Sequence, residues 1–331
     1  MLAFGVRIIF ISLLGICGMV TQLMADNNLA SGTTNSATVS LLTTNDAVEQ
    51  EFQRLMAADD AAQAEVDQWI RDNNAAAARG SAVPKADLER RIRERFRPVR
   101  EAYNDFLMRH PKHARAGLAY GRFLRDFHDN EGAREQWEKA LALNPQDPAA
   151  YNNLAHLYRQ TGPVTRAFES YGRVIALSPQ QPLYYRNLGD AIYLYRTQAM
   201  EYYHLDEQQI YDKVLELYRK ALSLDPTDFP LASDVAQVYY GFKPLRLEAA
   251  LRSWTNALAL ARDEIERQGV YLHFARLKLQ TNRFEEVRAH LSAVTNEMYA
   301  ELKQRLTRNL EEREQAARGT NAPPAAAARQ P

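Results

Sequence analysis

The sequence predicts an all-α fold, a right-handed superhelical solenoid built from helix–turn–helix repeats. Three prolines, Pro111, Pro145 and Pro179, follow one another at intervals of 34 residues. A strict period of this length is typical of stacked pairs of helices. Between the prolines, small and bulky residues recur at fixed places, as two closely packed helices require. An N-terminal helical extension and a C-terminal capping helix complete the predicted architecture.

The most regular stretch is 148–181. Small residues at Ala155 and Ala167 allow the axes of its two helices to approach closely. Pro179 cannot continue a helix and therefore forces a turn into the next unit. Bulky residues at helical spacing fill the contact on either side of the small ones, and they are Tyr151, Leu154, Tyr158, Tyr171 and Val174.

This stretch resembles one unit of the tetratricopeptide repeat (TPR) family, a helix–turn–helix of 34 residues. The resemblance extends over about residues 99–295, and it implies an array (114–295) of five repeats. Their expected bounds are 114–147, 148–181, 182–228, 229–267 and 268–295. The third repeat has an insertion, 195–208, in which we expect the first helix to run on and project from the array. Insertions in solenoids fall on one face, which is often the functional one.

Residues 1–25 differ from the rest of the chain. Arg7 precedes an apolar run over 8–20, and Ala25 is a small residue at which the segment can be cut. We interpret the segment as a signal peptide for export to the periplasm or cell envelope, with an uncleaved N-terminal anchor as the alternative. Cys17, the sole cysteine, lies inside it, so a chain cut after Ala25 has no thiol chemistry. Residues 26–45, rich in Ser, Thr and Asn, predict a flexible linker.

Residues 46–113 predict a helical region that ends in a capping half-repeat. Asp46 and Glu49 have the spacing of a capping box, and the alanine-rich stretch 73–84 interrupts the helical pattern. Pro98 lies where the second helix of the half-repeat would begin. Arginines interleaved with glutamates after residue 85 predict a solvated helix face with many ion pairs. A docking surface for an anionic partner is the alternative interpretation of this arginine-rich helix.

The C-terminal residues predict a capping helix over 296–317. Leu302, Leu306 and Leu310 form a single apolar stripe on an otherwise highly charged helix. Such a helix can cover the open end of a solenoid and expose a polar outer face. Residues 318–331, with Pro323, Pro324 and several alanines, predict a disordered tail.

Composition and motifs exclude several classes of function. The chain has 41 basic and 41 acidic residues, whereas nucleic-acid-binding proteins carry a basic excess. It contains no phosphate loop, dinucleotide fingerprint, serine-hydrolase elbow or zinc-protease motif. Glu201 and His204 have Glu-x-x-His spacing, but a di-iron site needs a second such motif. We therefore predict no enzyme, no catalytic residues, no cofactor and no metal.

The family resemblance implies a ligand groove lined by the first helix of each repeat. Its ligand-facing places are the second, fifth, ninth, twelfth and thirteenth, and they carry a strip of five arginines with Asp126 and Asp190. Arginine pairs carboxylates bidentately, so the strip predicts an acidic or C-terminal-carboxylate peptide, with ordinary solvated charges as the alternative. The candidate peptide-binding residues are Arg115, Arg122, Arg125, Asn152, His156, Arg159 and Arg186.

These observations predict a non-enzymatic, exported scaffold that binds a peptide or protein segment, an acidic one by the arginine count, in the concave groove. The alternative is a structural or assembly component of an envelope complex, which docks through the 195–208 insertion and the arginine-rich helix. Both hypotheses require a protein or peptide partner and no nucleic acid. Both involve a membrane only through an uncleaved N-terminal anchor.

Overall fold

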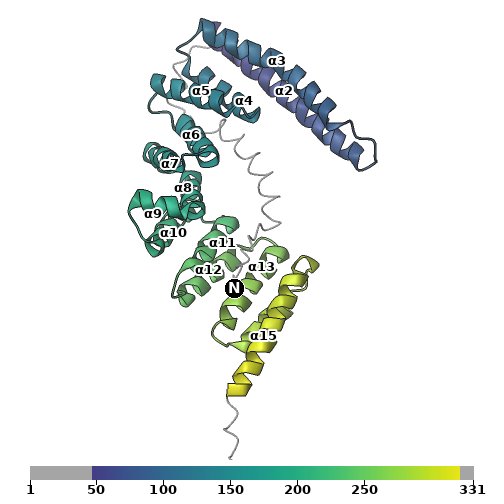
Figure 1. The fold of residues 1–331 in the computed structure, drawn as a ribbon, viewed down its shortest axis with the longest axis vertical. Helices are drawn as coiled ribbons and strands as arrows, with labels where there is room; N and C mark the ends of the chain where they lie inside the picture. The colour runs from purple at the N-terminus through teal and green to yellow at the C-terminus, as the bar shows by residue number, and fades with distance from the viewer. Residues whose placement is uncertain (1–46, 321–331) are drawn as a thin grey trace, which may run out of the picture. The chain divides into compact units, whose positions relative to one another are not determined.

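The structure, a computed structural model, describes residues 47–320, which form fourteen α-helices and their connections (Figure 1). The described chain divides into two compact units, one ending at Pro145 and one starting at Gln146. The predicted all-α array of helix pairs is confirmed. The expected signal peptide, the linker, Asp46 and the end of the tail lie outside the described residues.

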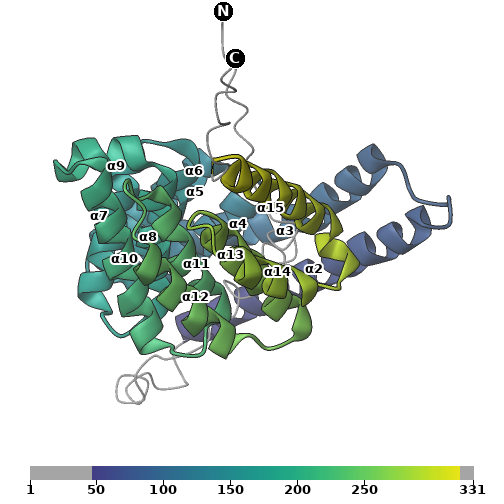
Figure 2. The same cartoon turned by 90° about the horizontal axis from the view of Figure 1, so that it is seen from below.

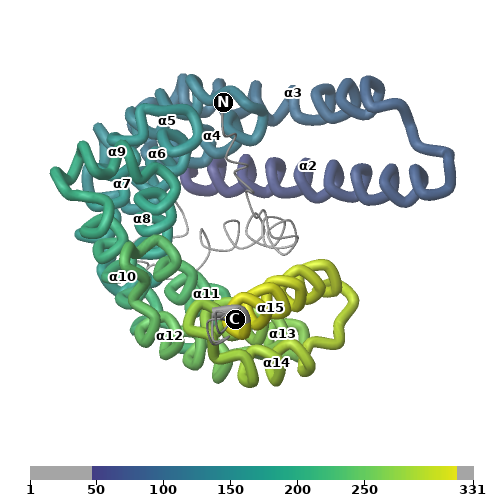
Figure 3. The backbone as a smooth tube through the Cα atoms, turned by 60° about the horizontal axis from the view of Figure 1, so that its bottom comes forward, coloured from purple at the N-terminus to yellow at the C-terminus, as the bar shows by residue number. Residues whose placement is uncertain are grey.

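The N-terminal unit contains α2 (Ala47–Ala77), α3 (Lys85–Arg109), α4 (Ala114–Asp126) and α5 (Asn130–Leu143). The two long helices α2 and α3 lie side by side as a hairpin (Figures 1 and 3). Apolar residues at helical spacing bury one stripe of each helix. Tyr103 is fully buried and stacks on Tyr120 of α4, with ring centroids 5.0 Å apart. Trp137 of α5 is also fully buried and closes the α4–α5 pair.

The predicted interruption of the helical pattern is present but starts later than residue 73, and the predicted helix start at Pro98 is wrong. Helix α2 continues through Asn73 as far as Ala77, and Pro98 lies inside α3 rather than at a helix start. Pro98 is exposed, while its neighbours Phe96 and Val99 are buried on one stripe of α3. Burial of that stripe holds the helix together across a residue that lacks an N–H group. Residues 85–109 are thus one helix of a hairpin, not a half-repeat.

The C-terminal unit consists of helix pairs in which consecutive helices pack on one another. The pairs are α6 (Pro148–Thr161) with α7 (Val164–Leu177), α8 (Pro182–Leu194) with α10 (Glu207–Leu224), α11 (Phe229–Val238) with α12 (Leu247–Leu260), and α13 (Glu264–Leu279) with α14 (Phe284–Ser292). Two short 3₁₀ turns, Tyr239–Gly241 and Glu297–Tyr299, follow α11 and precede α15.

Polar caps and prolines mark the starts and ends of these helices. Asp147 accepts hydrogen bonds from the backbone N–H groups of Ala149 and Ala150, at 2.9 and 3.3 Å, and Pro148 occupies the first turn. Helices α3, α5 and α7 each end two residues before Pro111, Pro145 and Pro179. Ala155 and Ala167 have no exposed surface, as the close α6–α7 contact requires.

The insertion in the third repeat forms a separate helix, α9 (Arg196–Tyr203), because α8 ends at Leu194. It does not simply extend α8 and project. Helices α7 and α9 are neighbours (Figure 2). Phe168 of α7 contacts both Tyr202 and Tyr203, with ring centroids 5.5 and 5.8 Å apart, so burial of aromatic surface holds α9 on α7. The expected restart at Asp206 is confirmed, since Asp206 and Gln209 form a reciprocal capping box.

The last repeat begins earlier than the predicted residue 268. Asp263 caps α13 by accepting from the backbone N–H of Glu266 at 2.8 Å, so the helix starts at Glu264. Gln268 is buried, and its side-chain oxygen accepts from the backbone N–H groups of Thr295 and Asn296, both at 2.8 Å. It therefore ties α13 to the segment that leads into α15.

Helix α15 (Ala300–Thr320) covers the last pair (Figure 3). Leu306 and Leu310 are buried in one cluster with Leu291 and Val294. The leucine stripe identified in the sequence is thus the contact surface of this helix. None of the helices within 47–320 has the length and apolar character needed to cross a membrane.

Candidate peptide-binding surface

The seven predicted binding residues fall into two sets. Arg115, Arg122 and Arg125 lie on α4 of the N-terminal unit. The other four lie in the C-terminal unit and are Asn152, His156 and Arg159 of α6 and Arg186 of α8.

On α4, two of the three arginines are paired with carboxylates. Arg115 donates to Glu49 at 2.9 Å and lies over the ring of Phe52, and Arg125 donates to Asp126 at 2.8 Å. These exposed or half-exposed pairs satisfy the guanidinium groups locally, and each contributes on the order of 0–1 kcal/mol to stability. Two of the three α4 arginines therefore already have a carboxylate partner within the unit.

Arg122, the third, is half-buried and faces a buried carboxylate that the sequence analysis missed. Asp59 of α2 is 1% exposed and accepts hydrogen bonds from Tyr103 at 2.7 Å and from Gln63 at 2.8 Å. Burial raises the pKa of Asp59, and the hydrogen bonds and Arg122 oppose that rise. The sequence did contain a signal for this buried carboxylate: an acidic residue lies between Leu55 and Ala62 at helical spacing, on an otherwise apolar stripe.

In the C-terminal unit, α6, α8 and α11 are linked by polar contacts. His156 of α6 contacts the hydroxyl of Tyr171 and the amide of Asn187 of α8, both at 3.3 Å. Arg186 of α8 donates to Asp228, which caps α11, at 3.3 Å and to Asp234 of α11 at 3.1 Å. The first helices of three successive repeats thus form one polar surface.

The pairing of Arg186 changes the charge expected for this surface. Sequence analysis assigned Arg186 to a basic strip, but Asp228 and Asp234 of the next repeat neutralise it. Asp190 of α8 adds a further carboxylate, which accepts from the Tyr218 hydroxyl at 2.6 Å. Burial raises the pKa of Asp190, and it raises the pKa of Asp234 to about 7 even though Arg186 opposes the shift. The surface is of mixed charge rather than basic.

A recess of about 260 Å³ opens on this surface. Leu194 at its edge is 61% exposed, which is unusual for a large apolar side chain in this chain. Asp234, Tyr218 and Gln237 are members of the surface that sequence analysis missed. The available signal for Gln237 was its position at the ninth, ligand-facing place of the repeat that starts at 229. The recess is lined by Arg159, Asp190, Tyr193, Leu194, Tyr218, Asp234, Gln237 and Val238.

Buried polar atoms without a hydrogen-bond partner recur at one place of the repeat. Asn152 Oδ1, Arg186 Nε and Ser233 Oγ belong to this group. Their residues occupy the fifth place of the first helix in the repeats that start at 148, 182 and 229. Arg159 Nε, at the twelfth place of the repeat that starts at 148, also lacks a partner. Native proteins satisfy most buried polar groups, so repeated exceptions on one surface indicate a place where a ligand completes the hydrogen bonding.

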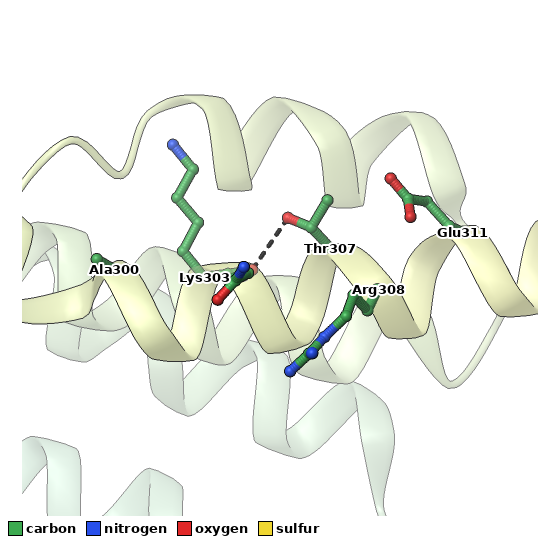
Figure 4. Close-up of a pocket in the computed structure, with 6 residues that line it drawn as sticks. Ala300, Lys303, Thr307, Arg308 and Glu311 are labelled. Carbon is green, nitrogen blue, oxygen red and sulfur yellow. Dashed lines mark hydrogen bonds between the residues drawn. The ribbon is translucent and has the colours of Figure 1, made fainter.

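A second depression, of about 380 Å³, lies along α15 (Figure 4). Its lining comes from this one helix, and Thr307 donates to the Lys303 carbonyl at 3.0 Å. Lys303 also donates to the Val294 carbonyl at 2.7 Å. The depression is an open stretch of helix surface without converging groups from other elements, so we assign no site to it. No group of potential metal ligands occurs within the described residues.

The fold and this surface define a helical-repeat protein with a polar surface on the first helices of its repeats. Comparison with known protein families also identifies helical repeats in this chain. Residues 128–162 match the family described as TPR repeat, and residues 148–181 match the tetratricopeptide repeat. The chain therefore contains TPR repeats, which generally serve as protein–protein interaction scaffolds and are typically non-catalytic. No curated protein matches the chain in sequence.

Several solved structures are similar to this chain at low sequence identity. The C-terminal part of a TPR repeat-containing protein from Cytophaga hutchinsonii is 14% identical, with a TM-score of 0.52 over 75% of this chain and 98% of that one. YrrB, described as a TPR protein with an unusual peptide-binding site, is 12% identical, with a TM-score of 0.48 over 65% of this chain and 99% of that one. PilF of Pseudomonas aeruginosa is 20% identical, with a TM-score of 0.43 over 62% and 87% of the two chains.

Proposed function

We propose that this protein is a non-enzymatic scaffold that binds an extended segment of a partner protein on α6, α8 and α11. The observation that carries the proposal is the recurrence of unpartnered polar atoms at the fifth place of three successive repeats, beside a recess. A peptide lying across these helices would present a backbone donor or acceptor at regular intervals. Each such contact would satisfy a group that has no partner within the described chain, once a small side-chain movement exposes it.

The charge of this surface affects which kind of partner segment can bind to it. An acidic peptide was expected from the count of arginines, but Arg186 already has two carboxylate partners, Asp228 and Asp234. Adding further negative charge beside Asp190 and Asp234 would be repulsive. A segment that is polar but not strongly acidic fits the C-terminal unit better.

A random dodecapeptide library, panned on the full-length protein, tests this proposal. Selected peptides should bind the wild type and lose at least about tenfold in affinity for Gln237→Trp, which fills the recess from an exposed position. Arg173→Gln on the exposed side of α7 is the matched control and should bind normally. Failure to select any peptide, or equal binding by Gln237→Trp, would contradict the proposal.

The alternative function, docking of an envelope complex through residues 195–208 and the arginine-rich helix, has less support. Helix α9 uses Tyr202 and Tyr203 to contact Phe168 within the chain. On α3, the arginines largely have intramolecular partners: Arg90 pairs with Asp87, Arg93 with Glu89 and Arg95 with Glu65, and Arg91 lies over Trp69. Surfaces already engaged in this way offer fewer groups to a partner.

The sequence of residues 1–25 supports the further proposal that the protein is exported to the periplasm or cell envelope. Expression of the full chain, followed by fractionation and N-terminal sequencing, tests it. A mature protein that begins at Asp26 in the exported fraction is expected. A full-length protein in the membrane fraction would indicate the anchor instead, and a full-length protein in the cytosol would rule out export.

A further inference from the structure

Two oppositely charged residues line the recess without pairing. The side chain of Arg159 forms no ion pair or hydrogen bond within the described chain, and its buried Nε is among the atoms that lack a partner. Only its backbone carbonyl is engaged, by the Tyr195 hydroxyl at 2.7 Å. Asp190 is held by Tyr218 and forms no salt bridge with Arg159, although the nearby charges of Arg186 and Arg159 both lower its pKa against the effect of burial.

The charges are also separated by element. Arg159 comes from α6, whereas Asp190 and Asp234 come from α8 and α11. Asp234 is compensated by Arg186, which does not line the recess. A guest in the recess therefore meets an unpaired cation from one helix and a carboxylate with spare acceptor capacity from another.

This arrangement discriminates between classes of guest. A carboxylate would pair with Arg159 but be repelled by Asp190 and Asp234. An ammonium or guanidinium group would pair with these carboxylates but be repelled by Arg159. An apolar side chain would leave both charges desolvated without compensation. A carboxamide suits both, because its oxygen accepts from Arg159 while its NH₂ group donates to Asp190.

The size and the walls of the recess favour one side chain rather than a small molecule. Its volume of about 260 Å³ lies below the roughly 300–1,000 Å³ of most small-molecule sites. Leu194 and Val238 provide apolar surface beside the charged groups, and Tyr193 adds an aromatic face. Such walls suit the methylene groups that carry a terminal carboxamide.

We propose that the recess binds the side-chain amide of a glutamine or asparagine in the partner segment, with Arg159 as donor and Asp190 as acceptor. This inference rests on the proposed peptide-binding function and assigns a residue class to one position of the ligand.

The test uses the full-length protein and the best peptide selected from the dodecapeptide library. Each Gln or Asn of that peptide is replaced in turn by Glu, Lys or Leu, and binding is measured by fluorescence anisotropy. One position should lose at least about tenfold in affinity with all three replacements. In Asp190→Asn, the affinity of the Glu peptide should rise relative to that of the amide peptide. In Arg159→Gln, the affinity of the Lys peptide should rise relative to that of the amide peptide. Glu216→Gln and Arg173→Gln, both at exposed positions, are the charge-matched controls and should keep the amide preference.

The outcomes separate this inference from the function on which it rests. A wild-type preference for Glu or Lys at the sensitive position, or the absence of any sensitive position, overturns the amide assignment while peptide binding stands. Unchanged specificity in both Arg159→Gln and Asp190→Asn, with unchanged circular dichroism spectra, also overturns it. If no peptide is selected at all, both proposals fail.

Discussion

Gly189 determines where the Tyr218 side chain can lie. A Cβ atom at this position would come within 2.4 Å of Tyr218 Cε1, closer than Cβ atoms approach non-bonded neighbours in proteins. The glycine lets the Tyr218 ring cross α8, and the Tyr218 hydroxyl then reaches Asp190, the next residue along the chain, at 2.6 Å. One missing methyl group thus positions part of the proposed recess.

Two glycine substitutions should therefore have opposite effects. Gly189→Ala should lower the free energy of unfolding by about 1–3 kcal/mol, because the added methyl group overpacks a buried contact. Gly172→Ala lies on α7 with no atom within 4 Å of the new Cβ and should stabilise by about 0.5–1 kcal/mol through helix propensity. Urea unfolding followed by circular dichroism measures both. Similar changes in the two variants would contradict the packing described.

Sequence analysis could predict such small-residue positions but not the ion pairs. Small residues recur at a fixed place within each repeat, so the period exposes them. Arg186 pairs with Asp228 and Asp234, which lie 42 and 48 residues away, across a repeat of irregular length. The insertion shifts the register between these residues, and no local pattern brings them together. The sign of the charge on the surface was therefore misjudged.

At the scale of elements, α3 shows how burial overrides local propensity. Proline in a helix interior removes one backbone hydrogen bond and crowds the preceding turn. The helix nevertheless continues through Pro98, because Phe96, Val99 and Tyr103 bury one continuous stripe. The sequence contained both the proline and the apolar stripe, but the pattern alone does not indicate which of the two has the larger effect on the helix.

Pro98→Ala should consequently stabilise the N-terminal unit. The new N–H group can donate along the helix, and an exposed position accepts alanine without clash, so we expect a gain of about 1–3 kcal/mol. Pro111→Ala, in the turn between α3 and α4, is the control and should instead lose about 0.4–1 kcal/mol through greater freedom of the unfolded chain. Thermal unfolding measures both changes. Destabilisation by Pro98→Ala would mean that its ring makes a needed contact.

The contact between α8 and α11 should make stability depend on pH. Burial raises the pKa of Asp234 from 3.8 to about 7, so between these values the folded state holds a proton that the unfolded state has lost. The contribution of this group to stability therefore falls as the pH rises from about 4 to about 7. Asp234→Asn removes that dependence.

We expect the wild type, relative to Asp234→Asn, to be more stable at pH 5 than at pH 8. Urea unfolding of both proteins at the two pH values gives the comparison. Glu216→Gln, on the exposed side of α10, should show no such difference. A constant gap between wild type and Asp234→Asn would show that the carboxyl titrates normally.

At the scale of the whole molecule, the fold was largely predictable because a period of 34 residues constrains every helix that obeys it. The errors lie where the period fails, at Pro98, at the insertion and at the start of α13. In the candidate site, His156 of α6 contacts Asn187 of α8, a proximity that follows from the repeat period. The contribution of the acidic residues of α11 to this surface could not be predicted, because it depends on which repeats are neighbours in space.

The array should depend on its last helix. Leu306 and Leu310 complete an apolar cluster with Leu279, Leu291 and Val294, which would otherwise face water. Removing residues 296–331 should speed hydrogen exchange in α13 and α14 by at least about tenfold and leave α6 and α7 nearly unchanged. A chain that ends at Thr320 is the control. Uniform acceleration throughout the C-terminal unit would show that the repeats unfold as one block.

The pairing of Arg186 with Asp228 and Asp234 has a consequence for how this array can change in evolution. Repeat proteins grow and shrink by duplication or loss of whole units, which succeeds when every junction is interchangeable. Here the third repeat supplies the guanidinium and the fourth supplies both carboxylates. Deleting either repeat would leave half-buried charge without its partner, which is unfavourable. These two repeats are therefore expected to be inherited together.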